Sequence, residues 1–111
     1  MKTFSDAFKG LGYFFKNELN AKIHSFITVL VFIAGFYLKL NINEWGLIIF
    51  AIALVFTAEI INTAIEKIMD MIQPDKDNRV RNIKDIAAGA VLFASIMSAI
   101  IGLIVFIPHL M

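Results

Sequence analysis

Residues 45–71 read WGLIIFAIALVFTAEIINTAIEKIMDM. The first half of this stretch, from Trp45 to Phe56, is entirely apolar or glycine. A helix needs roughly 20 residues to cross the hydrocarbon core of a bilayer. The stretch is long enough, so it predicts a transmembrane helix. Its second half contains acidic and amide side chains, which such a helix rarely carries without a function.

Two further apolar stretches, residues 23–40 and 86–107, lie on either side of this one. Polar segments separate the three, a short turn at 39–44 and a longer loop at 73–82. Pro74 and Pro108 are predicted to end the second and third helices, because proline lacks an amide proton and disfavours α geometry in the residue before it. The chain of residues 1–111 is therefore predicted to be a single all-α membrane domain with spans at 23–40, 45–71 and 86–107.

The composition supports this class. The 111 residues are 59% apolar, include no cysteine, and have a mean hydropathy of +0.81. Soluble domains are usually about 45–50% apolar. Without cysteine there is no disulfide scaffold, thiolate zinc site or thiol nucleophile. A net charge of +1 argues against a broad nucleic-acid surface, which needs a basic excess.

The first 22 residues are predicted to form an amphipathic helix in the membrane interface. Apolar side chains recur there at helical spacing, while lysine, aspartate and asparagine take the other face. Nine of the ten lysine and arginine residues lie before the first span or around the 73–82 loop, and only Lys39 lies at the short turn. The positive-inside rule therefore predicts a cytoplasmic N-terminus and an extracytoplasmic C-terminus.

The second span carries a polar stripe made of Glu59, Asn62, Glu66 and Asp70. At 100° per residue these four side chains fall within a sector of about 80°. A carboxylate in the hydrocarbon costs at least about 2.5–3.5 kcal/mol, so Glu59 should face protein or water. Asn62 could instead bond across helices, and Glu66 and Asp70 could be solvated acids. Facing carboxylates also suit Mg²⁺, and Glu18, which projects onto the apolar side of the first helix, could complete such a site.

The segment before the third span ends in Lys84 and Asp85. These could be a positive-inside anchor and a favourable acid at a helix start. As a site, Lys84 could pair with phosphate oxygens and Asp85 could accept a hydrogen bond from a base or ribose. The chain has no glycine-rich phosphate loop, so a nucleotide site would have to be built from side chains at helix ends.

A non-catalytic membrane subunit with an ion-carrying polar stripe is the alternative function. A conducting stripe should continue across the membrane, whereas the polar residues here lie in one half of the second span. This asymmetry favours chemistry at the membrane surface. The third span carries small residues four apart, which permit close approach of helices in lipid. They are Ala90, Ala94, Ser98 and Gly102.

The run Ala58-Glu59-Ile60-Ile61-Asn62-Thr63-Ala64-Ile65-Glu66 closely resembles the signature of the prokaryotic diacylglycerol kinase family, which includes undecaprenol kinases. The similarity extends to Asp70, to Lys84-Asp85 and to Asn17-Glu18, and it covers essentially the whole chain. Lys22 stands where the family usually has arginine. The loop Asp75-Lys76-Asp77 also departs from the family's commoner acidic-aromatic-histidine pattern.

The resemblance implies a homotrimeric kinase of the bacterial plasma membrane that transfers the γ-phosphoryl group of MgATP to the hydroxyl of a lipid alcohol, diacylglycerol or undecaprenol. Glu59 would be the general base. Glu18 and Glu66 would hold the metal. The nucleotide site would be lined by Asn62, Glu66, Asp70, Asp75, Asp77, Lys84 and Asp85.

Overall fold

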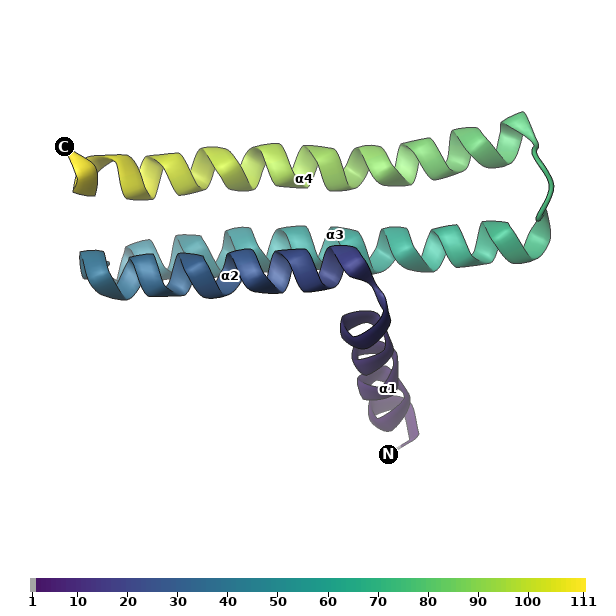
Figure 1. Ribbon diagram of the computed structural model, residues 1–111, viewed down its shortest axis with the longest axis horizontal. Helices are drawn as coiled ribbons and strands as arrows, with labels where there is room; N and C mark the ends of the chain where they lie inside the picture. Colours follow the sequence, from purple (N-terminus) through teal and green to yellow (C-terminus); the bar gives the residue numbers. More distant parts are fainter. Residues whose placement is uncertain (1) are drawn as a thin grey trace. The chain divides into compact units, whose positions relative to one another are not determined.

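The computed structural model describes residues 2–111, with side chains from residue 3 onward, and is helical throughout (Figure 1). Its helices are α1 (Lys2–Asn17), α2 (Leu19–Leu38), α3 (Ile42–Ile72) and α4 (Asn78–Leu110). The all-helical class is therefore confirmed. The chain forms two compact units, the first reaching to Tyr37 and the second spanning Leu38–Met111.

The first unit consists of α1 and α2, which are separated by a single non-helical residue, Glu18. The interfacial helix was predicted to run to residue 22, whereas α1 ends at Asn17. At that end the Asn17 side-chain amide donates to the carbonyl of Tyr13 at 3.0 Å. Asparagine side chains compete in this way with the helical backbone bonds. Residues 19–22 therefore belong to the long apolar helix α2, which begins before the predicted span.

Helix α1 has an apolar face that is largely exposed. Phe4 and Phe8 retain 63% and 72% of their accessible surface, and Leu11 and Phe15 follow on the same side. A soluble domain would normally bury such a face, whereas a helix in the membrane interface presents it to the acyl chains. The exposure is consistent with the predicted interfacial position.

The second unit is an antiparallel hairpin of α3 and α4. Near the middle the Ser98 hydroxyl donates to the carbonyl of Ala51 at 2.9 Å, and at the end away from the loop His109 Nε2 lies 2.7 Å from Glu44 Oε2. Ala94, one turn before Ser98, is also buried. The predicted close approach of the helices is therefore seen at positions 94 and 98, whereas a Cβ at Gly102 would meet no atom within 4 Å.

Local signals explain where these helices begin and end. Asn41 and Glu44 form a reciprocal capping box at the start of α3, with both side-chain to backbone distances at 2.9 Å. At the other end Gln73 is extended because Pro74 disfavours helical geometry in the residue before it. Pro108, predicted to end the third helix, instead lies within α4, which continues to Leu110.

Three helices, α2, α3 and α4, are long and apolar enough to cross a membrane. Large apolar side chains on their outer faces remain exposed, among them Phe26, Ile33, Phe50, Leu92 and Ile104. In lipid, such side chains need no protein cover. With 31 residues, α3 is about 46 Å long, which exceeds the roughly 30 Å hydrocarbon core. One end of the hairpin therefore extends well beyond the hydrocarbon.

Candidate active site

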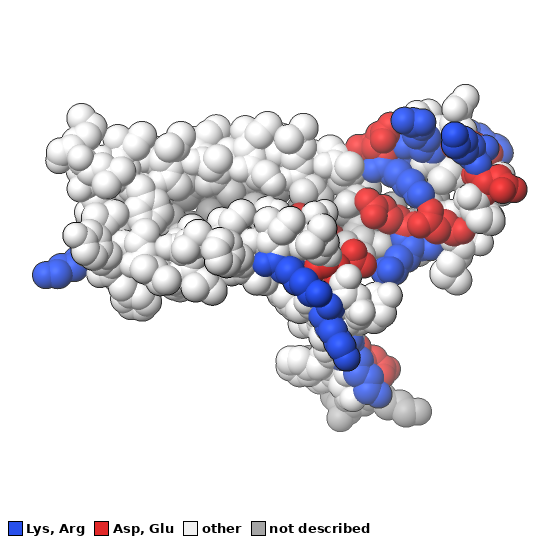
Figure 2. All heavy atoms as spheres, viewed as in Figure 1, with Lys and Arg blue, Asp and Glu red and all other residues white. Residues whose placement is uncertain are grey.

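Charged side chains of the hairpin gather at one end. On the face shown in Figure 2 they surround the loop between α3 and α4, while the rest of α4 is uncharged. The loop itself, residues 73–77, contributes two aspartates and a lysine. The polar stripe of α3 leads toward the same end. The chemistry-bearing residues of this unit are therefore concentrated at one side of the membrane.

The stripe on α3 begins with a buried carboxylate. Glu59 is 5% exposed, and it is the buried charged residue among those described. One turn farther along, the Asn62 amide donates to Glu66 Oε1 at 3.2 Å. This contact fixes the Glu66 carboxylate beside the amide and leaves its second oxygen available for another ligand. The structure thus confirms that Asn62 and Glu66 lie on the same face of α3.

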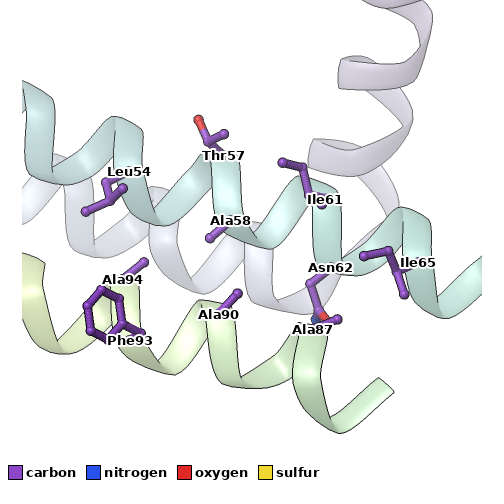
Figure 3. A pocket seen from close by; sticks show the side chains of 10 residues that line it. All are labelled: Leu54, Thr57, Ala58, Ile61, Asn62, Ile65, Ala87, Ala90, Phe93 and Ala94. Atoms are coloured by element: carbon purple, nitrogen blue, oxygen red, sulfur yellow. The ribbon is translucent and has the colours of Figure 1, made fainter. Parts of the chain in front are cut away.

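An apolar groove of about 350 Å³ lies between α3 and α4 beside this stripe (Figure 3). Small side chains of α4, Ala87, Ala90 and Ala94, form one wall. Asn62 points from α3 toward α4 at the polar end of the groove (Figure 3). Its side-chain oxygen is buried and accepts no hydrogen bond from the residues that the structure describes. Such a group usually needs a partner, so this oxygen is available to a ligand or water.

At the end of the stripe, Asp70 on α3 forms an ion pair with the Lys84 ammonium on α4. The two residues line a charged hollow of about 280 Å³. Asp75 from the loop also lines it. With Asp77, which also lines it, four of the predicted nucleotide residues are therefore brought together around one hollow.

Asp77 has a structural role at the same hollow. Its carboxylate caps α4 by accepting from the Arg79 amide at 2.8 Å, and it pairs with the Arg79 guanidinium at 3.0 Å. Hydrogen bonds from the Arg79 side chain, followed by the Arg79 amide, lower the pKa of Asp77 below its ordinary value. Asp77 is thus an ionised helix cap, a role that the sequence prediction did not include.

The other predicted site residues are placed as follows. Asp85 is exposed on α4, next to Lys84. Glu18 is the residue between α1 and α2 and belongs to the first compact unit. Lys76 and Arg81 also line the charged hollow but were not predicted as site residues. The sequence signal was present, because Arg81 precedes Lys84 by one helical turn, but Lys76 and Arg81 entered the sequence-based prediction only as cations that set the orientation.

The donor set suits a hard divalent cation that is shared with phosphates. Within Leu38–Met111, no three histidine, aspartate or glutamate side chains gather into a metal cluster. Magnesium bound to a nucleotide needs only one or two protein carboxylates, because phosphate oxygens and water complete its octahedron. Glu66, held by Asn62 and otherwise exposed, is suited to supply one of them.

Comparison with known proteins agrees with this arrangement. A sequence model described as "Prokaryotic diacylglycerol kinase" matches residues 5–106. The chain is 38% identical to a protein named undecaprenol kinase from Bacillus subtilis over 109 residues, which cover 98% of this chain and 89% of that protein. It is 34% identical to a protein named diacylglycerol kinase from a Synechocystis species over 110 residues, 98% of this chain and 63% of that protein. The chain belongs to the prokaryotic diacylglycerol kinase family and is a membrane lipid kinase.

Proposed function

We propose that this lipid kinase transfers the γ-phosphoryl group of MgATP to the hydroxyl of a membrane lipid alcohol, diacylglycerol or undecaprenol. The observation that carries the proposal is the polar stripe of α3, which starts at the buried Glu59 and ends at the charged hollow lined by Asp70 and Lys84. Phosphoryl transfer at a membrane surface needs a base close to the lipid hydroxyl and cations that neutralise the phosphates of the nucleotide.

The depth of each group supports its role. Glu59 is 14 residues from Trp45, about 21 Å along the helix, and therefore lies in the last third of a 30 Å hydrocarbon core. Glu66 is about 10 Å farther along, close to the edge of the core. A lipid hydroxyl lies at the boundary between hydrocarbon and headgroups, within the reach of the stripe. The nucleotide, which is water-soluble, would occupy the charged hollow at its end.

The proposed reaction is a single displacement. The lipid oxygen attacks the γ-phosphorus, its proton passes to the Glu59 carboxylate, and the bond from the γ-phosphorus to the bridging oxygen of ADP breaks. Glu66 and Glu18 would hold the Mg²⁺ ion, which neutralises phosphate charge when it is bound. Lys84 would contact the phosphates. Asn62, Asp70, Asp75, Asp77 and Asp85 would line the nucleotide site.

The assembly and orientation are part of the proposal. Three short helices do not enclose a site that excludes water, so we expect a homotrimer that shares sites between subunits. The cations around the 73–77 loop support an orientation with this end of the hairpin at the cytoplasmic face of a bacterial plasma membrane, where ATP is available. The N-terminus would then be cytoplasmic and the C-terminus extracytoplasmic.

The experiment is a competition between acceptors. Purified protein in mixed micelles is supplied with Mg²⁺, ATP labelled at the γ-phosphate, and equal amounts of diacylglycerol and undecaprenol, and the labelled lipids are separated. We expect label in a lipid phosphate, with the ratio of the two products giving the preferred alcohol. Label released only as inorganic phosphate, or none transferred to either alcohol, would contradict the proposal.

A further inference from the structure

We propose that Arg81 is a second phosphate-binding residue, which contacts the nucleoside triphosphate alongside Lys84 and sets the affinity for it. The inference rests on the proposed function, because it concerns the nucleotide of the same site. It concerns a residue that had been interpreted only as a membrane anchor.

Arg81 and Lys84 lie on the same face at the start of α4. Arg81 lies in the first turn of α4, and its amide bonds to the Asp77 carbonyl at 3.0 Å. Lys84 follows three residues later, so the two side chains project from the same face of the helix. Both line the charged hollow at the end of the hairpin. Two cations are thus presented to one space by a rigid element rather than by the loop.

Most other charges around the hollow already have an ion-pair partner. Around this hollow, Asp70 is paired with Lys84, and Asp77 is paired with Arg79. The Arg81 guanidinium forms no ion pair with any residue in the described part of the chain. Apart from the two pairs, the lining contains Lys76 and Arg81 against the single carboxylate of Asp75. Arg81 is thus a cation of this lining whose guanidinium has no carboxylate partner among the described residues and is available to an anion.

The chemistry of the side chain identifies the ligand class. A guanidinium presents its donors in a planar fork that matches two phosphate oxygens, and it remains charged at any working pH. Lys84 shares its ammonium with Asp70 and acts as a point charge. Arg81 can therefore supply the bidentate contact that Lys84 cannot. Lys76 also carries a charge, but it stands on the loop and would lose more conformational entropy on binding.

The test measures nucleotide binding directly, without the lipid. Titration calorimetry with Mg²⁺ and adenylyl imidodiphosphate, a non-hydrolysable ATP analogue, is carried out on the full chain in detergent. We expect Arg81→Gln to raise the Kd about tenfold, since a charge-assisted bidentate contact is lost, and Arg81→Lys to raise it by about threefold. In the lipid kinase assay the same variants should raise the KM for MgATP and leave kcat within about twofold.

Arg79→Gln is the matched control. It removes the same charge from the same end of the hairpin, but Arg79 is 90% exposed, is already paired with Asp77, and does not line the hollow. We expect its Kd to stay within about twofold of the wild type. Equal losses in the Arg79 and Arg81 variants would mean a general field effect and would overturn the inference. An unchanged Kd for Arg81→Gln would also overturn it. If the glutamine variant does not fold, an unchanged Kd for Arg81→Lys would do so instead.

The outcomes separate this inference from the proposed function. If the wild type binds the analogue and Arg81→Gln weakens binding, Arg81 is a nucleotide residue even where no lipid alcohol is phosphorylated. If the wild type phosphorylates a lipid alcohol and Arg81→Gln keeps the wild-type Kd and KM, the proposed function holds and the inference about Arg81 fails.

Discussion

Replacing Glu59 with glutamine tests the proposed general base most directly. Glutamine keeps the size of the side chain and its ability to form hydrogen bonds, but it cannot accept the proton of the lipid hydroxyl. Loss of a general base typically lowers the rate by about 10²–10⁴-fold. This corresponds to about 2.7–5.4 kcal/mol of barrier height. Nucleotide affinity should change little, because the charged hollow lies about 16 Å farther along α3.

Burial gives the opposite expectation for stability. Glu59 is 5% exposed, and burying an ionised carboxylate is more costly than burying an amide. If Glu59 served only the fold, the variant would keep its activity and be as stable as the wild type or more so. The catalytic role instead predicts an inactive variant that unfolds at the same temperature as the wild type or at a higher one.

The measurement combines three quantities in one micelle preparation, namely kcat with a lipid alcohol, Kd for the ATP analogue, and the thermal midpoint. Glu44→Gln is the control, since Glu44 is a glutamate on the same helix, at its other end, and glutamine still allows a capping box. It should leave kcat near the wild-type value. A folded Glu59→Gln protein with near-normal turnover would remove this residue from the mechanism.

Glu66→Gln and Glu18→Gln should each raise the Mg²⁺ concentration needed for half-maximal activity. The oligomer should stay intact in gel filtration. An unchanged Mg²⁺ dependence in both variants would refute the metal assignment. Ser98→Leu should force α3 and α4 apart and lower the free energy of unfolding in detergent by about 1–3 kcal/mol. Ser98→Ala loses only the hydrogen bond to Ala51 and should lower it by about 0.6 kcal/mol. Lys39 has a φ of 58°, a left-handed conformation that favours glycine. Lys39→Gly should therefore raise the free energy of unfolding by about 0.5–1 kcal/mol, and an unchanged thermal midpoint would show that the turn is unstrained. Reporters fused to the two ends should be read as cytoplasmic at the N-terminus and extracytoplasmic at the C-terminus, and finding both on one side would exclude three spans.

The helices could be predicted from the sequence because three apolar stretches of sufficient length leave few alternatives in a membrane. Their ends were harder to predict. Hydropathy marks where the hydrocarbon ends rather than where the helix ends, so α4 starts at Asn78, well before the predicted span at residue 86. Glu18 interrupts the first 22 residues although their apolar spacing continues to Leu19. Pro108 does not end α4 at once: its missing amide proton removes one bond, to the carbonyl of Ile104, and the helix ends two residues later at Leu110.

The stripe of α3 could also be predicted, because residues on one helix have a fixed angular relation. The structure places Asn62 in contact with Glu66, as that spacing requires. Contacts between helices do not follow from spacing. The pairing of Asp70 with Lys84, and the capping of α4 by Asp77, depend on the length and conformation of the loop. Arg81 was therefore indistinguishable from an anchor until the structure showed which cations were already neutralised.

The length of the hairpin explains why the site lies where it does. Helix α3 exceeds the hydrocarbon core by about 16 Å, and α4, with 33 residues, exceeds it by slightly more. Most of the excess lies at the loop end, because at the opposite end only Ile42, Asn43 and Glu44 precede Trp45 and the apolar run that follows it. The projecting turns carry Asp70, Lys84 and Arg81 into water, while Glu59 on the same helix remains buried. In the proposed site, this pair of helices would present its residues to a water-soluble nucleotide and to a membrane-bound alcohol at two positions along one stripe. Shortening the hairpin at the loop would remove the proposed nucleotide residues and leave the spans intact.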